Sequence, residues 1–176
     1  MRKLISLALV LASLALAGGS VRVTPVHPVE ALPFIGQLYA VNLTPPEGAK
    51  SLWVAVFKGY DPEAVYLLSA PAAPELRVTS GIMDATTVAC PAQRLVATIV
   101  GGEEVKLGEA CLANWIPYAI TWATEDTKAP LGTWVPLWTA KPVHPKLKEI
   151  EPPLLAFLYW SDRPAGEEPT SRPKKP

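Results

Sequence analysis

The chain has 176 residues, in which 16 basic side chains balance 16 acidic ones, and it contains 20 prolines but only two histidines and two cysteines. A balanced charge without a basic stripe argues against a nucleic-acid partner, and the frequent prolines exclude long helices. Only two Asn and two Gln accompany the prolines. Such a composition is typical of thermophile proteins, although a GC-rich genome biases a sequence in the same way.

Residues 1–17 have the features of a signal peptide. Two basic residues precede an apolar run over 4–14, and Ala15 and Ala17 match the A-x-A pattern, so that cleavage is expected before Gly18. An uncleaved anchor is the alternative, but the run is shorter than the roughly 20 residues that span a bilayer. We therefore expect an exported protein of the periplasm, the outer envelope or the extracellular space, with no membrane span after cleavage.

Residues 18–162 are predicted to form one domain of short strands separated by Pro and Gly. In the segment 118–122, Tyr118, Ile120 and Trp122 would share one face of a strand. Strands at this spacing without helical partners predict an all-β, antiparallel β-sandwich that is immunoglobulin-like by architecture. The last segment lacks β-branched residues, so a short helix is an alternative there. The strand-like segments are 34–43, 51–57, 64–68, 75–80, 93–100, 103–107, 118–124, 133–138 and 154–160.

The two cysteines, Cys90 and Cys111, predict a disulfide, because an isolated pair in an exported chain is most simply oxidised. The residues between them read as a hairpin that turns at Gly101-Gly102. A two-residue turn would place Cys111 opposite Ala92, one pair out of register with Cys90, which is near the limit for a disulfide. A longer loop or a bulge would change that register. A redox pair is the alternative, but the C-x-x-C spacing is missing.

The tetrapeptide PVHP occurs at 25–28 and again at 142–145, and its copies contain both histidines, His27 and His144. Proline on either side favours an extended, exposed backbone, which is typical of a connector. If the first and last strands were parallel neighbours, the two imidazoles would lie at one end of the domain. Two histidines are still too few for a usual metal site. They are weak metal candidates, and no cofactor is expected.

Six tryptophans are many for a domain of this size, and two of them flank a proline in the segment 133–139. Regular alternation would place Trp134, Pro136 and Trp138 on one face, with Pro136 at a sheet edge or outside the ladder. Exposed together, Trp134 and Trp138 would form a binding face for a protein or for sugar rings. The alternative is that both indoles cap the core.

The chain end at 163–176 contains four prolines, charges of both signs and almost no apolar side chains. Such a segment cannot bury enough surface to offset the entropy of ordering. We therefore predict a disordered, protease-sensitive tail.

Catalytic motifs are missing from the sequence: there is no G-x-S-x-G, no phosphate-binding glycine loop and no H-E-x-x-H. An enzyme is therefore not expected, although two carboxylates at a suitable separation could hydrolyse glycosides without a motif. The sequence predicts a non-catalytic structural or protein-interaction module of a bacterial cell envelope, with another envelope or extracellular protein as its partner. The alternative is a module that binds carbohydrate or another ligand through an exposed Trp face.

Overall fold

The computed structural model describes residues 18–26, 38–59, 61, 63–74, 76–84, 94–101, 105–112, 118–124, 127–144, 146 and 152–173. Within these ranges the chain forms eleven β-strands and no α-helix. The strands are β1 (Gly19–Thr24), β2 (Leu38–Thr44), β3 (Ser51–Lys58), β4 (Ala64–Pro71), β5 (Leu76–Asp84), β6 (Arg94–Gly101), β7 (Lys106–Leu112), β8 (Tyr118–Trp122), β9 (Lys128–Ala129), β10 (Trp134–Pro142) and β11 (Leu154–Ser161). The predicted signal peptide, His27 and Cys90 lie outside the described residues. In the described ranges no helix has the length and apolar character needed to cross a membrane.

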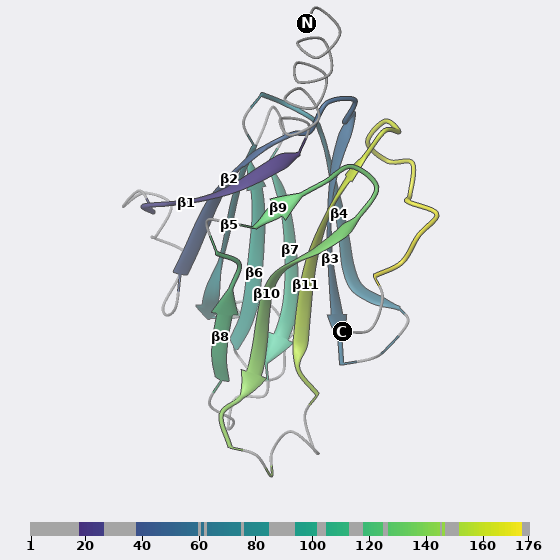
Figure 1. Ribbon diagram of the computed structural model, residues 1–176. Helices are drawn as coiled ribbons and strands as arrows, with labels where there is room; N and C mark the ends of the chain where they lie inside the picture. The colour runs from purple at the N-terminus through teal and green to yellow at the C-terminus, as the bar shows by residue number, and fades with distance from the viewer. Residues whose placement is uncertain are drawn as a thin grey trace, which may run out of the picture.

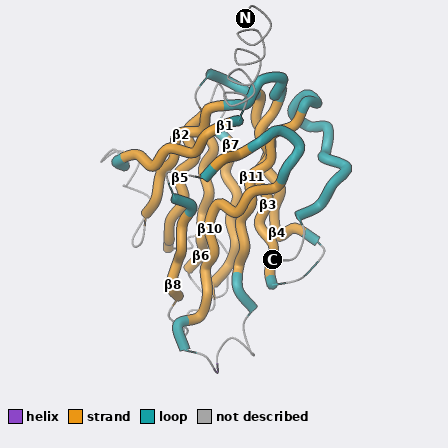
Figure 2. Tube along the Cα trace, viewed as in Figure 1, coloured by secondary structure: helices purple, strands orange, loops and turns teal. Residues whose placement is uncertain are grey.

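The strands form two sheets that pack face to face (Figure 1). The six-stranded sheet has the order β7-β6-β5-β2-β1-β9, and the five-stranded sheet has the order β4-β3-β11-β10-β8. Every ladder between named strands is antiparallel. The chain passes repeatedly from one sheet to the other, and the described residues in Figure 2 are strands, loops and turns. The predicted all-β fold of antiparallel sheets is confirmed.

The core lies between the two sheets and follows the period-two alternation of the strands. The inward side chains of β11 lie beside those of its neighbour β3 in the same sheet. Leu158 pairs with Val54 and Trp160 with Leu52, and all four side chains are almost fully buried. Valine and leucine side chains of β2 and β5 close this core from the six-stranded sheet. The segment 154–160 is therefore a strand, and the alternative of a short helix there is wrong.

Aromatic side chains join the two sheets beside β8. Tyr39 of β2 stacks on Trp122 of β8, with ring centroids 4.5 Å apart and an interplanar angle of 11°. Trp122 in turn meets the buried Trp138 of β10 edge to face at 6.4 Å. The Tyr39 hydroxyl donates a hydrogen bond to the backbone carbonyl of Ala123. This row of rings fixes the separation of the sheets on one side of the sandwich.

On the other side of the sandwich a tyrosine lies directly on a glycine. Tyr66 points inward from β4, an edge strand of one sheet, and Gly108 lies on β7, an edge strand of the other. A Cβ atom added to Gly108 would lie 2.4 Å from the Tyr66 ring. The glycine is therefore required by the close approach of the two edges. Burial raises the pKa of the Tyr66 phenol well above its ordinary value.

Three finer predictions differ from the structure. The β6–β7 hairpin exists, but its last pair is Val100 with Lys106, so the connection is longer than a two-residue turn. Cys111 consequently faces Leu95 and not Ala92. The first and last strands are not parallel neighbours, because β1 and β2 belong to the six-stranded sheet and β11 to the five-stranded one. Strands β1 and β9 were not predicted.

Candidate binding surface

A β-bulge in β10 separates the two tryptophans that regular alternation would place together. The register with β11 shifts between Pro136 and Trp138. A bulge adds one residue to one strand and so reverses which face the following side chains point to. Val135, Leu137 and Trp138 all join the core, and Trp138 is only 2% exposed. The predicted common face of Trp134 and Trp138 is therefore wrong.

Proline accounts for the position of this bulge. Pro136 has no N–H to donate, and a bulge tolerates the missing ladder bond. Pro136 still pairs with Phe157 of β11, whereas the ladder with β8 begins only at Trp138. The first half of β10 is thus free of β8, which agrees with the predicted edge position of the proline.

Trp134 points to the opposite side from Trp138, onto the outer face of the five-stranded sheet. There its indole packs against Tyr159 of β11, with ring centroids 4.9 Å apart and an interplanar angle of 36°. A second hydrophobic cluster continues from this pair across the same face, with Phe157 of β11 meeting Phe57 of β3 edge to face at 6.1 Å. We call this surface the aromatic face; its members are Ala55, Phe57, Ala64, Leu67, Trp134, Leu155, Phe157 and Tyr159.

The chain end passes over the aromatic face instead of leaving the molecule. After β11, a turn closed by the bond from the Glu167 N–H to the Pro164 carbonyl redirects the backbone. Gly166 has φ +93° in this turn, a conformation that side chains other than glycine rarely adopt. The segment then runs back along the molecule, as the loop beyond β11 in Figure 2 shows.

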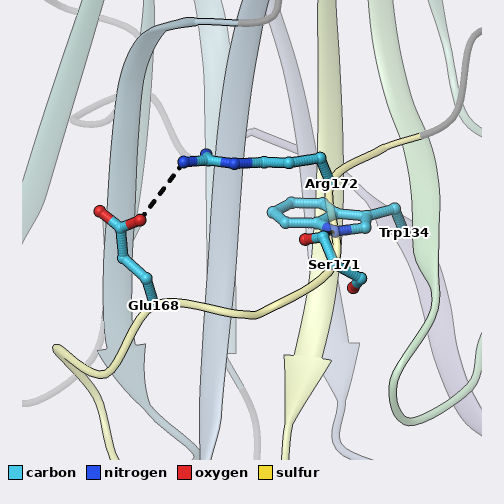
Figure 3. Close-up of polar contacts among 4 residues, drawn as sticks. All are labelled: Trp134, Glu168, Ser171 and Arg172. Atoms are coloured by element: carbon cyan, nitrogen blue, oxygen red, sulfur yellow. Dashed lines mark hydrogen bonds and ion pairs between the residues drawn. The ribbon is translucent and has the colours of Figure 1, made fainter.

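Two hydrogen bonds tie this segment to the sheet. At its start, the Ser51 hydroxyl donates to the Arg163 carbonyl at 2.8 Å. Near its end, the Trp134 Nε1–H donates to the Ser171 carbonyl at 2.9 Å, and Figure 3 shows the indole beside that backbone. The tail that the sequence predicts to be disordered has a definite course here over residues 163–173, and 174–176 lie outside the described residues.

A groove of about 410 Å³ lies where the end of the segment meets the sheet. Trp134, Pro136 and Phe157 belong to its sheet side, and Arg172 and Pro173 to its tail side. An apolar groove with one directed polar donor is the usual form of a binding site for an organic or peptide ligand. The aromatic face offers such a donor in the Trp134 indole N–H.

The other candidate residues lie elsewhere. His144 is exposed just beyond β10, where its Nδ1 accepts a bond from the Lys146 N–H at 3.3 Å. Within the described ranges no group of three or more His, Cys, Asp or Glu side chains could hold a metal ion. Cys111 lies with Leu107 on the exposed side of β7, and the exposed Val105 directly precedes that strand, whereas Cys90 is outside the described residues.

Sequence reasoning missed Tyr159, Phe157 and the tail as parts of a surface. The available signal was the composition of two strands, because 51–57 and 154–160 are apolar on both faces. Such strands need a cover on each side of their sheet. No protein-family model, curated protein or solved structure matches this chain.

Proposed function

We propose that the chain is a non-catalytic protein-interaction module, exported to a bacterial cell envelope, which binds its partner through the aromatic face. The observation that supports this proposal is the half-buried Trp134, whose indole N–H reaches a backbone carbonyl across an apolar surface. Tryptophan combines a large apolar ring with one donor and is enriched at the energetic centres of protein interfaces. The partner is another envelope or extracellular protein.

The alternative is a carbohydrate-binding module. Its platform would be Trp134 with Tyr159, the pair of half-buried rings that the outer face offers in place of Trp134 with Trp138. A flat sugar platform needs coplanar rings with polar groups beside them. The 36° tilt between these two rings favours a protein segment over a sugar.

An immunoglobulin-like connection of the strands and a Cys90–Cys111 disulfide belong to the same proposal of an exported module. A disulfide that closes this loop would stabilise the fold by about 3 kcal/mol through its effect on the unfolded chain. Denatured mature protein that has not been reduced should therefore show no reaction with a thiol reagent. Two reactive thiols would contradict the disulfide.

Peptide and glycan arrays probed with the mature chain would test the function. We expect binding to peptide spots that is lost in the Trp134→Ala variant. The matched control is Val105→Ala, which shortens an apolar side chain that is 71% exposed directly before β7 and should leave binding unchanged. Trp134-dependent binding to glycans alone would instead support the carbohydrate alternative, and Trp134-independent binding would move the interface away from the aromatic face.

A further inference from the structure

Resting on the proposed function, we infer that the aromatic face recognises extended, proline-containing peptide segments, and that the chain's own tail occupies the site until a partner segment displaces it. The occupant is visible in the structure. The tail residues Ser171, Arg172 and Pro173 line the groove, and the Ser171 backbone contributes the carbonyl that accepts the Trp134 indole N–H.

The burial of the tail indicates which of its residues are recognised. Within 162–173, Pro169 and Pro173 are half-buried and every other residue is exposed. Proline has no N–H, so its ring can pack on an apolar surface without leaving a donor unsatisfied. Glu168 and Arg172 each precede a proline, which restricts both to extended conformations.

The combination of contacts matches a known mode of peptide recognition. Proline-rich segments dock into aromatic grooves because their extended backbone is stiff before binding, and little entropy is lost. The exposed carbonyls of such a backbone accept hydrogen bonds from side chains of the groove. Here the rings of Trp134, Tyr159 and Phe157 form the aromatic surface, and the Ser171 carbonyl accepts the bond.

The tail is held weakly enough to be exchanged. The ion pair between Arg172 and Glu168, at 3.4 Å, lies within the tail, and both side chains are more than half exposed (Figure 3). Such a pair contributes little to docking. Beyond the turn at Gly166, the described part of the tail has one hydrogen bond to the sheet, the bond from Trp134, and its half-buried residues are Pro169 and Pro173.

Tethering explains how so weak a contact can still occupy the site. A short flexible linker gives its end an effective concentration on the order of millimolar. A free peptide with a Kd of about 0.1 mM would then bind about tenfold more weakly to the intact chain than to a chain whose tail is released. A partner segment must therefore bind the groove tightly enough, or be present at a high enough concentration, to compete with the tail.

The test uses full-length chains and a labelled peptide of residues 166–173, GEEPTSRP. The variant Pro169→Gly/Pro173→Gly keeps the length of the chain but removes the two half-buried rings of the tail, of which Pro173 lines the groove. We expect this variant to bind the peptide at least about tenfold more tightly than the wild type, as measured by fluorescence anisotropy. A peptide with alanine in place of both prolines should not bind. Adding Trp134→Phe to the glycine variant should weaken peptide binding without abolishing it, because the substitution removes the N–H donor and only part of the ring.

A measurement on the wild type covers the case in which the glycine variant does not fold. Unlabelled peptide at millimolar concentration should move the backbone amide signals of Thr170 and Ser171 in the ¹⁵N-labelled chain towards those of a disordered segment. No movement of these signals would overturn the inference, as would equal affinity of a folded released variant and the wild type. If the chain forms a concentration-dependent dimer that requires the tail, the groove holds the tail of a second copy. That result would overturn the inference that the tail occupies the groove of its own chain. Each of these results leaves the array test of the proposed function unaffected.

Discussion

Replacing Gly108 with alanine measures how tightly the edges of the two sheets are packed. The added Cβ would lie 2.4 Å from two atoms of the Tyr66 ring and 2.9 Å from a third, whereas ordinary contacts begin at 3.4 Å. Because Tyr66 is confined by the core, the ring or the β7 backbone must move. Overpacking of this kind typically costs about 1–3 kcal/mol.

The expected net effect is smaller, because alanine gains about 0.5–1 kcal/mol over glycine in a strand. We expect Gly108→Ala to lower the free energy of unfolding by about 1–2 kcal/mol, a fall in Tm of about 2–8 °C for a chain of this size. Urea denaturation followed by circular dichroism gives the free energy directly. The control is Gly101→Ala, where the nearest atom to the new Cβ is 3.6 Å away and no loss is expected.

A double-mutant cycle identifies the cause of the loss. In a Tyr66→Ala background the ring is absent, so Gly108→Ala should become neutral or stabilising. An equal loss with and without the ring would show that the strain lies in the β7 backbone. That result would refute the explanation by contact between the sheets.

The remaining predictions concern single side chains. Trp138→Ala should destabilise the fold by about 3–5 kcal/mol, because it empties a buried position in the core, whereas Trp134→Ala should cost clearly less in the same urea titration. The raised pKa of Tyr66 keeps its phenol protonated in the folded state, while the phenol of the unfolded chain ionises from about pH 10. The free energy of unfolding should therefore fall as the pH rises above 10, by up to about 1.4 kcal/mol per pH unit. The variant Tyr66→Phe should lack this part of the alkaline loss. Replacing both His27 and His144 with alanine should shift Tm little, and Zn²⁺ should not raise the Tm of the wild type. A rise in Tm with Zn²⁺ that vanishes in the double variant would contradict the interpretation of the two PVHP segments as connectors.

Period-two alternation and proline punctuation were sufficient to predict most of the strands. The segments 51–57, 64–68 and 154–160 lie within β3, β4 and β11. These signals are local, because each strand carries its own pattern of burial. Strand β1 was missed because its neighbour, the first PVHP segment, suggested a connector, and β9 is too short to carry a pattern.

Register and sidedness could not be read from the sequence in the same way. The Gly101-Gly102 pair favours a two-residue turn, yet the pairing of Val100 with Lys106 requires a longer connection. Similarly, the bulge at Pro136 adds one residue to β10 and turns Trp138 inward. A single inserted residue reverses every side chain that follows, so a small local choice decides which tryptophan lies on the outer face of the sheet.

The aromatic face also explains why a polar, proline-rich chain end lies against this sheet. Strands that are apolar on both faces would leave an exposed hydrophobic surface, which soluble proteins usually cover or use for binding. A permanent cover would be expected to bury many of its own apolar side chains. Between the turn at Gly166 and Pro173, the last residue that the structure describes, the tail contributes two half-buried prolines and one accepted hydrogen bond, while its charged residues in that stretch stay in solvent. A cover of this kind protects the surface in the isolated chain and still costs little to remove, which is what a site for an incoming segment requires.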